Sequence, residues 1–147
     1  MELPDGIHEE IVRLSKAGDA LAAERRFEEA LAKYAAALSL LPEPKEDWEA
    51  ATWLFVAAGD AHFLRADFTA GCESLSTAMR CAGALGNPFI HLRLGQCQFE
   101  LGQLDPAADE LMRAYMGAGR KIFDLQDPKY LLFLSTKAKN IDSPKKA

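Results

Sequence analysis

Residues 18–37 of the chain read GDALAAERRFEEALAKYAAA. Nine and twelve positions after its first glycine come a bulky apolar residue, Phe27, and a small residue, Ala30. Sixteen and nineteen positions after that glycine come an aromatic residue, Tyr34, and another small residue, Ala37. The segment falls among helix-forming residues and contains no alternating β-branched pattern of a strand. It therefore predicts helical structure with an ordered series of small and large positions.

The same series of residue types recurs twice further along the chain. The matching positions are Gly59, Phe68, Gly71, Leu75 and Ala78 in the second copy, and Gly95, Leu104, Ala107, Leu111 and Ala114 in the third. Five positions that agree in type across three copies indicate an internal repeat. The first glycines of successive copies lie 41 and 36 residues apart, and the extra residues fall in the turn-forming segments 43–47 and 86–88.

This pattern resembles the tetratricopeptide repeat, a helix–turn–helix unit of about 34 residues with small residues where its two helices cross. The copies span about residues 11–44, 52–85 and 88–121, although Gly71 and Gly83 stand where the family usually has alanine and proline. The resemblance implies an all-α fold of three helical hairpins in a right-handed superhelical stack. A helix over about 128–138 lies outside the repeats and is expected to cap the open end of the stack.

The start signals and turn formers predict seven helices in one domain, residues 1–139, followed by a flexible tail, residues 140–147. The predicted helices are 6–24, 27–41, 46–65, 68–85, 88–101, 105–124 and 128–138. Polar residues suited to cap helix starts are Asp5, Asn87, Asp105 and Asp127, and the prolines expected in the first helical position are Pro88, Pro106 and Pro128. The glycines of residues 117–121 are interpreted as a close-packed or loosened helical turn rather than an anion-binding loop.

Composition and charge exclude several classes of function. The 147 residues contain 17 Lys and Arg against 22 Asp and Glu, a net charge of −5, which argues against nucleic-acid binding. No apolar run approaches the roughly 20 residues that span a bilayer, and the N-terminus lacks the features of a signal peptide. Three cysteines without a CxxC pair are typical of thiols in a reducing compartment. We therefore expect a cytoplasmic protein without a nucleic-acid or membrane partner.

Catalytic and metal-binding patterns are absent from the sequence. The three histidines, His8, His62 and His91, stand without HExxH, CxxC or paired Cys/His spacing, and they are interpreted as structural residues. No phosphate-binding glycine loop or nucleophile elbow is found. The sequence therefore predicts a protein that is not an enzyme and that needs no cofactor or metal.

The first helix of each hairpin is expected to line a concave face, which is the usual binding surface of such stacks. Counting around these helices places Val12, Ser15, Asp19 and Ala22 on that face in the first repeat. The candidate partner-binding residues are Trp53, Val56, Asp60, Phe63, Phe89, Leu92, Arg93, Gln96 and Phe99. Trp, Phe and Arg are enriched at binding hot spots, so a protein partner is the expected ligand. Residues 122–134 are apolar enough to fold back over the Phe89–Phe99 face, and the sequence leaves this open.

Several partners remain compatible with this face. Some members of the tetratricopeptide family clamp a chaperone's C-terminal carboxylate with basic and amide side chains, and of the corresponding residues here only Arg93 suits a carboxylate. Short acidic three-repeat bacterial proteins of the family resemble immunity proteins, which neutralise a cognate toxin domain. They also resemble secretion-system chaperones or adaptors, which hold a peptide segment of an exported protein. A self-associating scaffold that dimerises through Tyr130–Leu134 or through the open end of the repeats is the remaining alternative.

Overall fold

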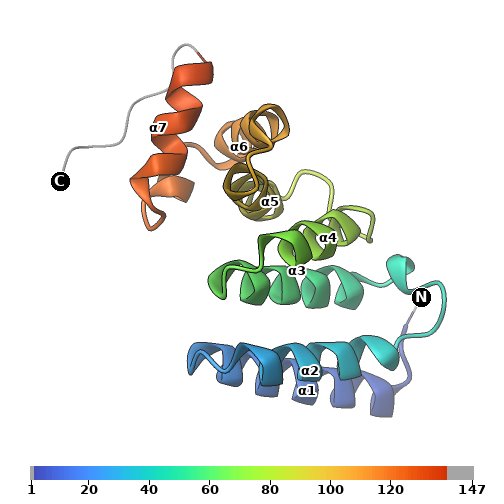
Figure 1. Ribbon diagram of the computed structural model, residues 1–147. Coiled ribbons are helices and arrows are strands. Elements are labelled where there is room, and N and C mark those ends of the chain that lie inside the picture. The colour runs from blue at the N-terminus through green and yellow to red at the C-terminus, as the bar shows by residue number, and fades with distance from the viewer. Residues whose placement is uncertain (1, 139–147) are drawn as a thin grey trace. The chain divides into compact units, whose positions relative to one another are not determined.

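The computed structural model describes residues 2–138 and is built from α-helices (Figure 1). The described residues contain no β-strand, which confirms the all-α prediction. The α-helices are α1 (Asp5–Ala23), α2 (Phe27–Ser39), α3 (Glu49–Leu64), α4 (Phe68–Met79), α5 (Pro88–Glu100), α6 (Leu104–Ala118) and α7 (Pro128–Lys137). Two short 3-10 helices, Lys45–Asp47 and Arg120–Phe123, precede α3 and α7. The tail predicted at residues 140–147 lies outside the described residues.

The chain divides into two compact units, one of residues 1–85 and one that begins at Gly86. The first unit contains α1 to α4, and the second contains α5, α6, the 3-10 helix Arg120–Phe123 and α7. The single domain expected over residues 1–139 stays a prediction.

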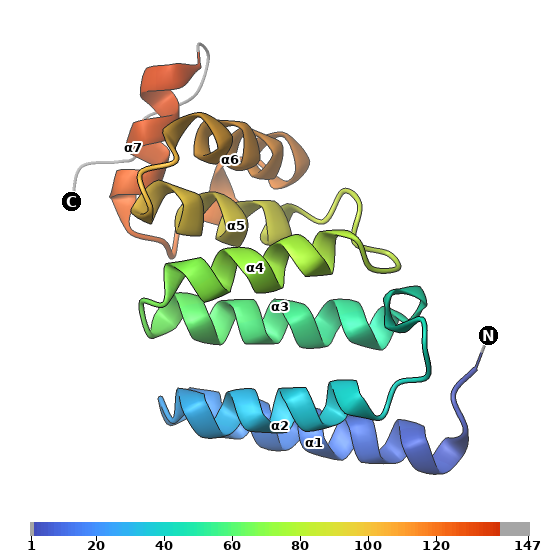
Figure 2. The ribbon, with the colours of Figure 1, turned by 45° about the vertical axis from the view of Figure 1, so that its right-hand side comes forward.

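In three helical hairpins, the paired helices cross at the same kind of contact, between a glycine and a large side chain. The pairs α1–α2, α3–α4 and α5–α6 each pack against each other (Figure 2). In each pair, the first glycine of the repeat faces the large residue sixteen positions later. A Cβ atom added at the glycine would come within 3 Å of that side chain, and the three pairs are Gly18–Tyr34, Gly59–Leu75 and Gly95–Leu111. Because only a hydrogen fits at these points, the glycines of the repeat set the distance between the paired helices.

In the first unit, α2 and α3 pack against each other and close a shared core. The core side chains come from α1, α2, α3 and the turns after α2 and α4, and include Ile11, Leu14, Tyr34, Leu41, Leu54 and Cys81. Polar side chains tie down the connections. The Lys45 Nζ donates to the Leu38 carbonyl at 3.0 Å, and the Thr52 hydroxyl donates to the Ala82 carbonyl at 2.6 Å. The start of α3 is therefore anchored to the end of α2 by Lys45 and to the turn after α4 by Thr52.

Two of the four predicted N-caps are confirmed. The Asn87 and Asp127 side chains accept the backbone N–H groups of Phe89 and Lys129, each at 3.0 Å, and Pro88 and Pro128 occupy the first helical position. Asp5 is instead the first residue of α1. Likewise, α6 begins at Leu104, so Asp105 and Pro106 lie inside its first turn. Asp67, which the sequence analysis did not single out, caps α4 by accepting the Ala70 N–H at 3.2 Å.

Three predicted helices are shorter than expected. The helix predicted over 46–65 is interrupted at Trp48, whose backbone is extended, so α3 begins at Glu49. The helix predicted over 68–85 ends at Met79, before a turn in which Gly83 has a φ of +76°. The helix predicted over 105–124 ends at Ala118, because Gly119 has a φ of +77° that a helix does not accommodate. Residues 117–121 therefore contain the last turn of α6, where a Cβ at Gly117 would lie 2.9 Å from Pro88 Cγ, and the start of the 3-10 helix Arg120–Phe123.

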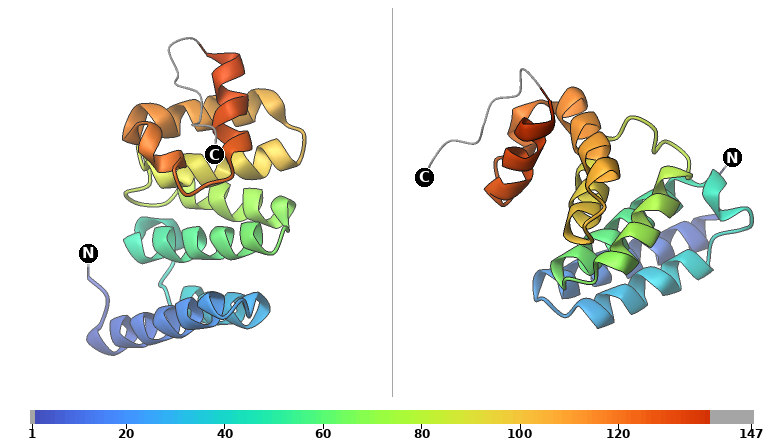
Figure 3. Two further views of the ribbon diagram at one scale, coloured as in Figure 1. Left: turned by 90° about the vertical axis from the view of Figure 1, so that its left-hand side faces the viewer. Right: turned by 45° about the horizontal axis from the view of Figure 1, so that its top comes forward.

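In the second unit, α7 follows the α5–α6 hairpin and crosses it (Figure 3). The Phe99 ring of α5 packs against the rings of Tyr130 and Phe133, with centroids 5.4 Å and 5.0 Å away. The Tyr130 hydroxyl donates to Glu100 Oε1 at 2.9 Å, and Lys129 Nζ lies 2.5 Å from the same oxygen. The side chains of Tyr130, Leu131 and Leu134 are buried. The C-terminal helix thus completes the core of its own unit, as expected of a cap.

Candidate binding groove

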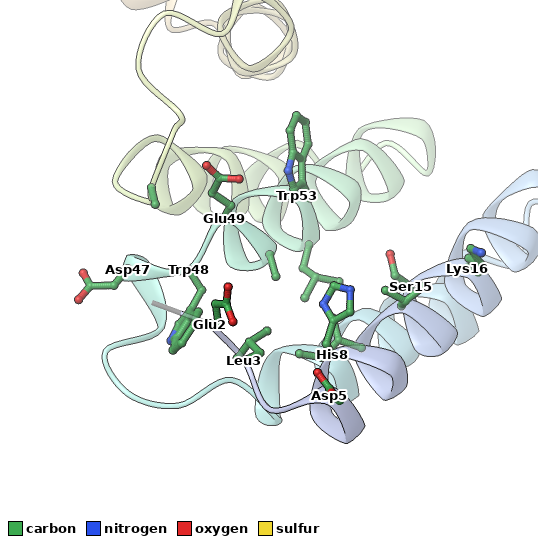
Figure 4. Close-up of a pocket in the computed structure, with 15 residues that line it drawn as sticks. Glu2, Leu3, Asp5, His8, Ser15, Lys16, Asp47, Trp48, Glu49 and Trp53 are labelled. Carbon is green, nitrogen blue, oxygen red and sulfur yellow. The ribbon is translucent and has the colours of Figure 1, made fainter.

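A groove of about 870 Å³ lies in the first unit, between the N-terminal half of α1 and the start of α3 (Figure 4). One face of α1 supplies side chains at helical spacing: Asp5, His8, Ile11, Val12, Ser15 and Lys16. One face of α3 supplies Glu49, Ala50, Trp53 and Leu54. The segment before α1 and the turns around α3 add Glu2, Leu3, Asp47, Trp48 and Ala82. We call this set of residues the α1–α3 groove.

The α1–α3 groove has an apolar part that belongs to the core of the unit. Ile11 and Leu54 line the groove and are both buried in the core. Trp48 packs partly buried against the same core, and its indole N–H donates to the Pro42 carbonyl at 2.9 Å. Because these side chains are fixed by the fold, the apolar part of the groove is preformed.

Trp53 is the most distinctive side chain of the groove. It is 61% exposed, although it belongs to a helix whose neighbouring residues Thr52 and Leu54 are buried. Tryptophan offers a large rigid apolar surface and is among the residues most enriched at binding hot spots. Glu49 lies four residues before Trp53 and is therefore on the same face of α3, as Figure 4 shows.

The charged residues of the groove are mostly acidic. Four carboxylates line it, from Glu2, Asp5, Asp47 and Glu49, against one lysine, Lys16. All five side chains belong to exposed residues. The imidazole of His8, also exposed, lies on the α1 side of the groove (Figure 4). The groove therefore presents net negative charge around an apolar interior.

The second predicted cluster of binding residues lies on α5, and the C-terminal segment of the same unit covers it. Gln126 Oε1 accepts hydrogen bonds from Arg93 Nη1 at 3.2 Å and from Gln96 Nε2 at 2.9 Å. Arg93 Nη1 also donates to Gln96 Oε1 at 2.8 Å, and its guanidinium lies over the Phe89 ring. Tyr130 and Phe133 pack on Phe99. Residues of the segment 122–134 thus fold back over this face.

Burial excludes several of the predicted contact residues as surface contacts in this conformation. Leu92 and Gln96 are fully buried, Arg93 is 7% exposed, and Val56 on α3 is buried as well. Phe89, Phe99, Asp60 and Phe63 are half-buried, and the Phe63 ring meets the Phe68 ring edge-on at 5.9 Å. Among the nine predicted contact residues, only Trp53 is exposed. The binding prediction for α5 requires the C-terminal segment to move away, because that segment occupies the face.

Each histidine has a different environment. His91 is buried, and its Nδ1 lies 2.6 Å from Glu110 Oε2 across the α5–α6 hairpin. Burial, followed by the charge of Arg65, lowers the pKa of the half-buried His62. His8 is exposed in the groove, so it does not have the packing role expected from the sequence. Within residues 2–138, no three His, Cys, Asp or Glu side chains are grouped so that they could hold a metal ion.

The sequence analysis missed the acidic part of the groove. Asp5 was expected as a cap, and Glu49 and Asp47 were placed in or near a helix start without a role. For α3, helical spacing is sufficient to predict the position of Glu49 beside Trp53, because Glu49 is one turn before Trp53 on the same face. Nothing in the sequence indicates that Asp47 and Trp48 lie beside α1, since only the folding of the α2–α3 connection brings them there.

No protein-family model and no curated protein matches this chain. In the part of the chain that the structure describes, no helix is long and apolar enough to cross a membrane.

Proposed function

We propose that the chain is a non-catalytic protein-binding protein of the tetratricopeptide type, and that the α1–α3 groove is its binding site. The family assignment is supported by the crossing shared by three hairpins, and the right-handed superhelical stack is what the resemblance to the family implies. Each crossing places a glycine against the large residue sixteen positions later. The same device in three copies is the signature expected of a repeat protein.

One observation carries the choice of the binding site: the exposed Trp53 beside a preformed apolar groove. Exposure of this indole to water is unfavourable, and a partner that buries the Trp53 side chain gains hydrophobic free energy on binding. The predicted α5 cluster is a weaker candidate, because Gln126, Tyr130 and Phe133 already cover it.

Within this function, an immunity protein that neutralises a cognate toxin domain is our first choice. The alternative is a secretion-system chaperone or adaptor that holds a peptide segment. The choice rests on the resemblance to short acidic members of the family, and the groove is compatible with both. The self-associating scaffold is the weaker alternative, because Tyr130, Leu131 and Leu134 are buried within their own unit and only Leu132 of that segment is exposed.

A capture experiment tests the site. Tagged wild-type protein, the Trp53→Ala variant and the control variant Leu125→Ala are used to retain proteins from a lysate of the native cells. Leu125 is a suitable control because it is 96% exposed and lies outside the groove. We expect one protein to be retained by the wild type and by Leu125→Ala and to be lost with Trp53→Ala. Equal retention by all three proteins would reject the groove as the binding site.

Competition separates the two kinds of partner. If the captured protein is a toxin, its isolated folded domain should displace the full-length partner at far lower concentration than any short peptide from it. If the protein is a chaperone substrate, a peptide of the bound segment should compete on its own. Light scattering on the purified protein tests the scaffold alternative. A dimer would support this alternative, and a strict monomer at high concentration would reject it.

A further inference from the structure

We propose that the α1–α3 groove takes a basic segment of the partner, in which an arginine or lysine stands beside an apolar side chain. This inference rests on the proposed function, because it gives the chemistry of what the same groove holds. It is carried by three features of the groove: its unneutralised carboxylates, the pairing of Trp53 with Glu49, and its apolar interior.

Among the residues that the structure describes, no lysine or arginine neutralises the carboxylates of the groove. In residues 2–138, none of Glu2, Asp5, Asp47 and Glu49 forms an ion pair with a lysine or arginine. Elsewhere on the first hairpin, carboxylates have arginine partners: Glu10 pairs with Arg13, and Glu29 pairs with Arg26. The groove therefore keeps a negative potential that attracts a cationic partner and repels nucleic acid.

Glu49 and Trp53 together form a suitable receptor for one cationic side chain. They lie one helical turn apart on the same face of α3 and both line the groove, and Figure 4 shows both side chains projecting from the same side of the helix. A guanidinium or ammonium group over an indole face is attracted by the ring, and Glu49 supplies a carboxylate next to it. An arginine suits this pair best, because its planar group can stack on the ring and donate to the carboxylate at once.

The size and interior of the groove define the rest of the segment. A volume of about 870 Å³ accommodates a few side chains of one partner segment, whether that segment belongs to a folded domain or to an extended peptide. Ile11, Leu54 and Trp48 offer apolar contacts for the residue next to the cation. A second copy of this chain is a poor occupant, because each copy carries a net charge of −5.

Selection from a library of random 12-residue peptides displayed on phage tests this inference with the full-length protein as bait. We expect the enriched peptides to contain arginine or lysine beside an aromatic or branched aliphatic residue. The dissociation constant of the most enriched peptide is then measured by fluorescence anisotropy. Trp53→Ala should weaken its binding by tenfold or more, and Glu49→Gln by about two- to fivefold. Higher salt should weaken it too, whereas the control Glu9→Gln, an exposed carboxylate of α1 outside the groove, should not.

Several results would overturn the basic-segment inference: no enriched peptide, enriched peptides without basic residues, or binding that is unchanged by Glu49→Gln and by salt. Capture from a lysate distinguishes a failure of the basic-segment inference from a failure of the proposed function. The triple variant Asp5→Asn, Asp47→Asn, Glu49→Gln is tested beside Trp53→Ala. If the partner is lost with Trp53→Ala but retained by the triple variant, the groove is still the binding site and the basic-segment inference is rejected. A partner kept with Trp53→Ala rejects the groove itself.

Discussion

Replacing Gly95 by alanine should destabilise the protein, although alanine is the better helix former. Gly95 lies in the interior of α5, where the change from glycine to alanine at an unhindered site gains about 1 kcal/mol. Here the added Cβ would lie 2.8 Å from Leu111 Cγ, 2.9 Å from its Cδ2 and 3.1 Å from its backbone nitrogen. Carbon atoms in contact prefer about 3.5–4.0 Å, so all three distances are too short.

The size of the effect follows from what can move. The Leu111 side chain is fully buried, so it has little space to rotate away, and its backbone nitrogen can only move with α6 as a whole. Overpacking of a core costs about 1–3 kcal/mol, and we take about 3 kcal/mol because the neighbouring backbone must shift. After subtracting the gain of about 1 kcal/mol from helix propensity, the net destabilisation is about 2 kcal/mol. For a unit of this size, that lowers the melting temperature by about 10 °C.

Urea denaturation followed by circular dichroism at 222 nm measures this difference. The matched control is Gly6→Ala in α1, because a Cβ at Gly6 would meet nothing within 4 Å. We expect the control to be as stable as the wild type or slightly more stable. A Gly95→Ala variant that matches or exceeds the wild type would refute the reasoning, since it would mean that the α5–α6 crossing has room for a methyl group.

Three further changes have outcomes that the structure specifies. Gln126→Ala removes the acceptor of the buried Gln96 amide, so it should cost about 1–3 kcal/mol and speed hydrogen exchange in α7, measured by mass spectrometry, while amides of α1 keep their rates. Burial raises the pKa of the Tyr34 hydroxyl, which also donates to Asp19 at 2.6 Å. The neutral phenol is thus favoured by folding, and its stabilisation is complete below pH of about 10 and is lost as the pH rises further. Tyr34→Phe should therefore cost about 1 kcal/mol at pH 7 and flatten the fall in stability towards pH 11, measured by urea denaturation at both pH values. Trp53→Ala should change the free energy of unfolding by less than about 0.5 kcal/mol, since the side chain is exposed; a larger loss would mean that its effect on binding reports unfolding.

The sequence alone determined the hairpins, because their signals are local. The positions of Gly18, Gly59 and Gly95 predicted where paired helices cross, and the caps Asn87 and Asp127 predicted two helix starts within one residue. Helix ends were less predictable. Gly83 and Gly119 end or follow a helix because of their positive φ, but glycine also occurs inside helices, as at Gly59.

The binding surface depended on tertiary structure, and the α5 face shows why. Helical spacing placed Leu92, Arg93 and Gln96 on one side of a helix, but spacing does not state what packs against that side. The answer came from Gln126, thirty residues beyond Gln96 in the chain, whose amide fits the two polar side chains. The groove has the same origin: Trp53 was readable from its position on the helix, whereas its acidic neighbours from the N-terminal segment and the turn before α3 were brought together only by folding. Periodicity along one helix gives the direction of a side chain, and its partner is decided by segments that are distant in the sequence.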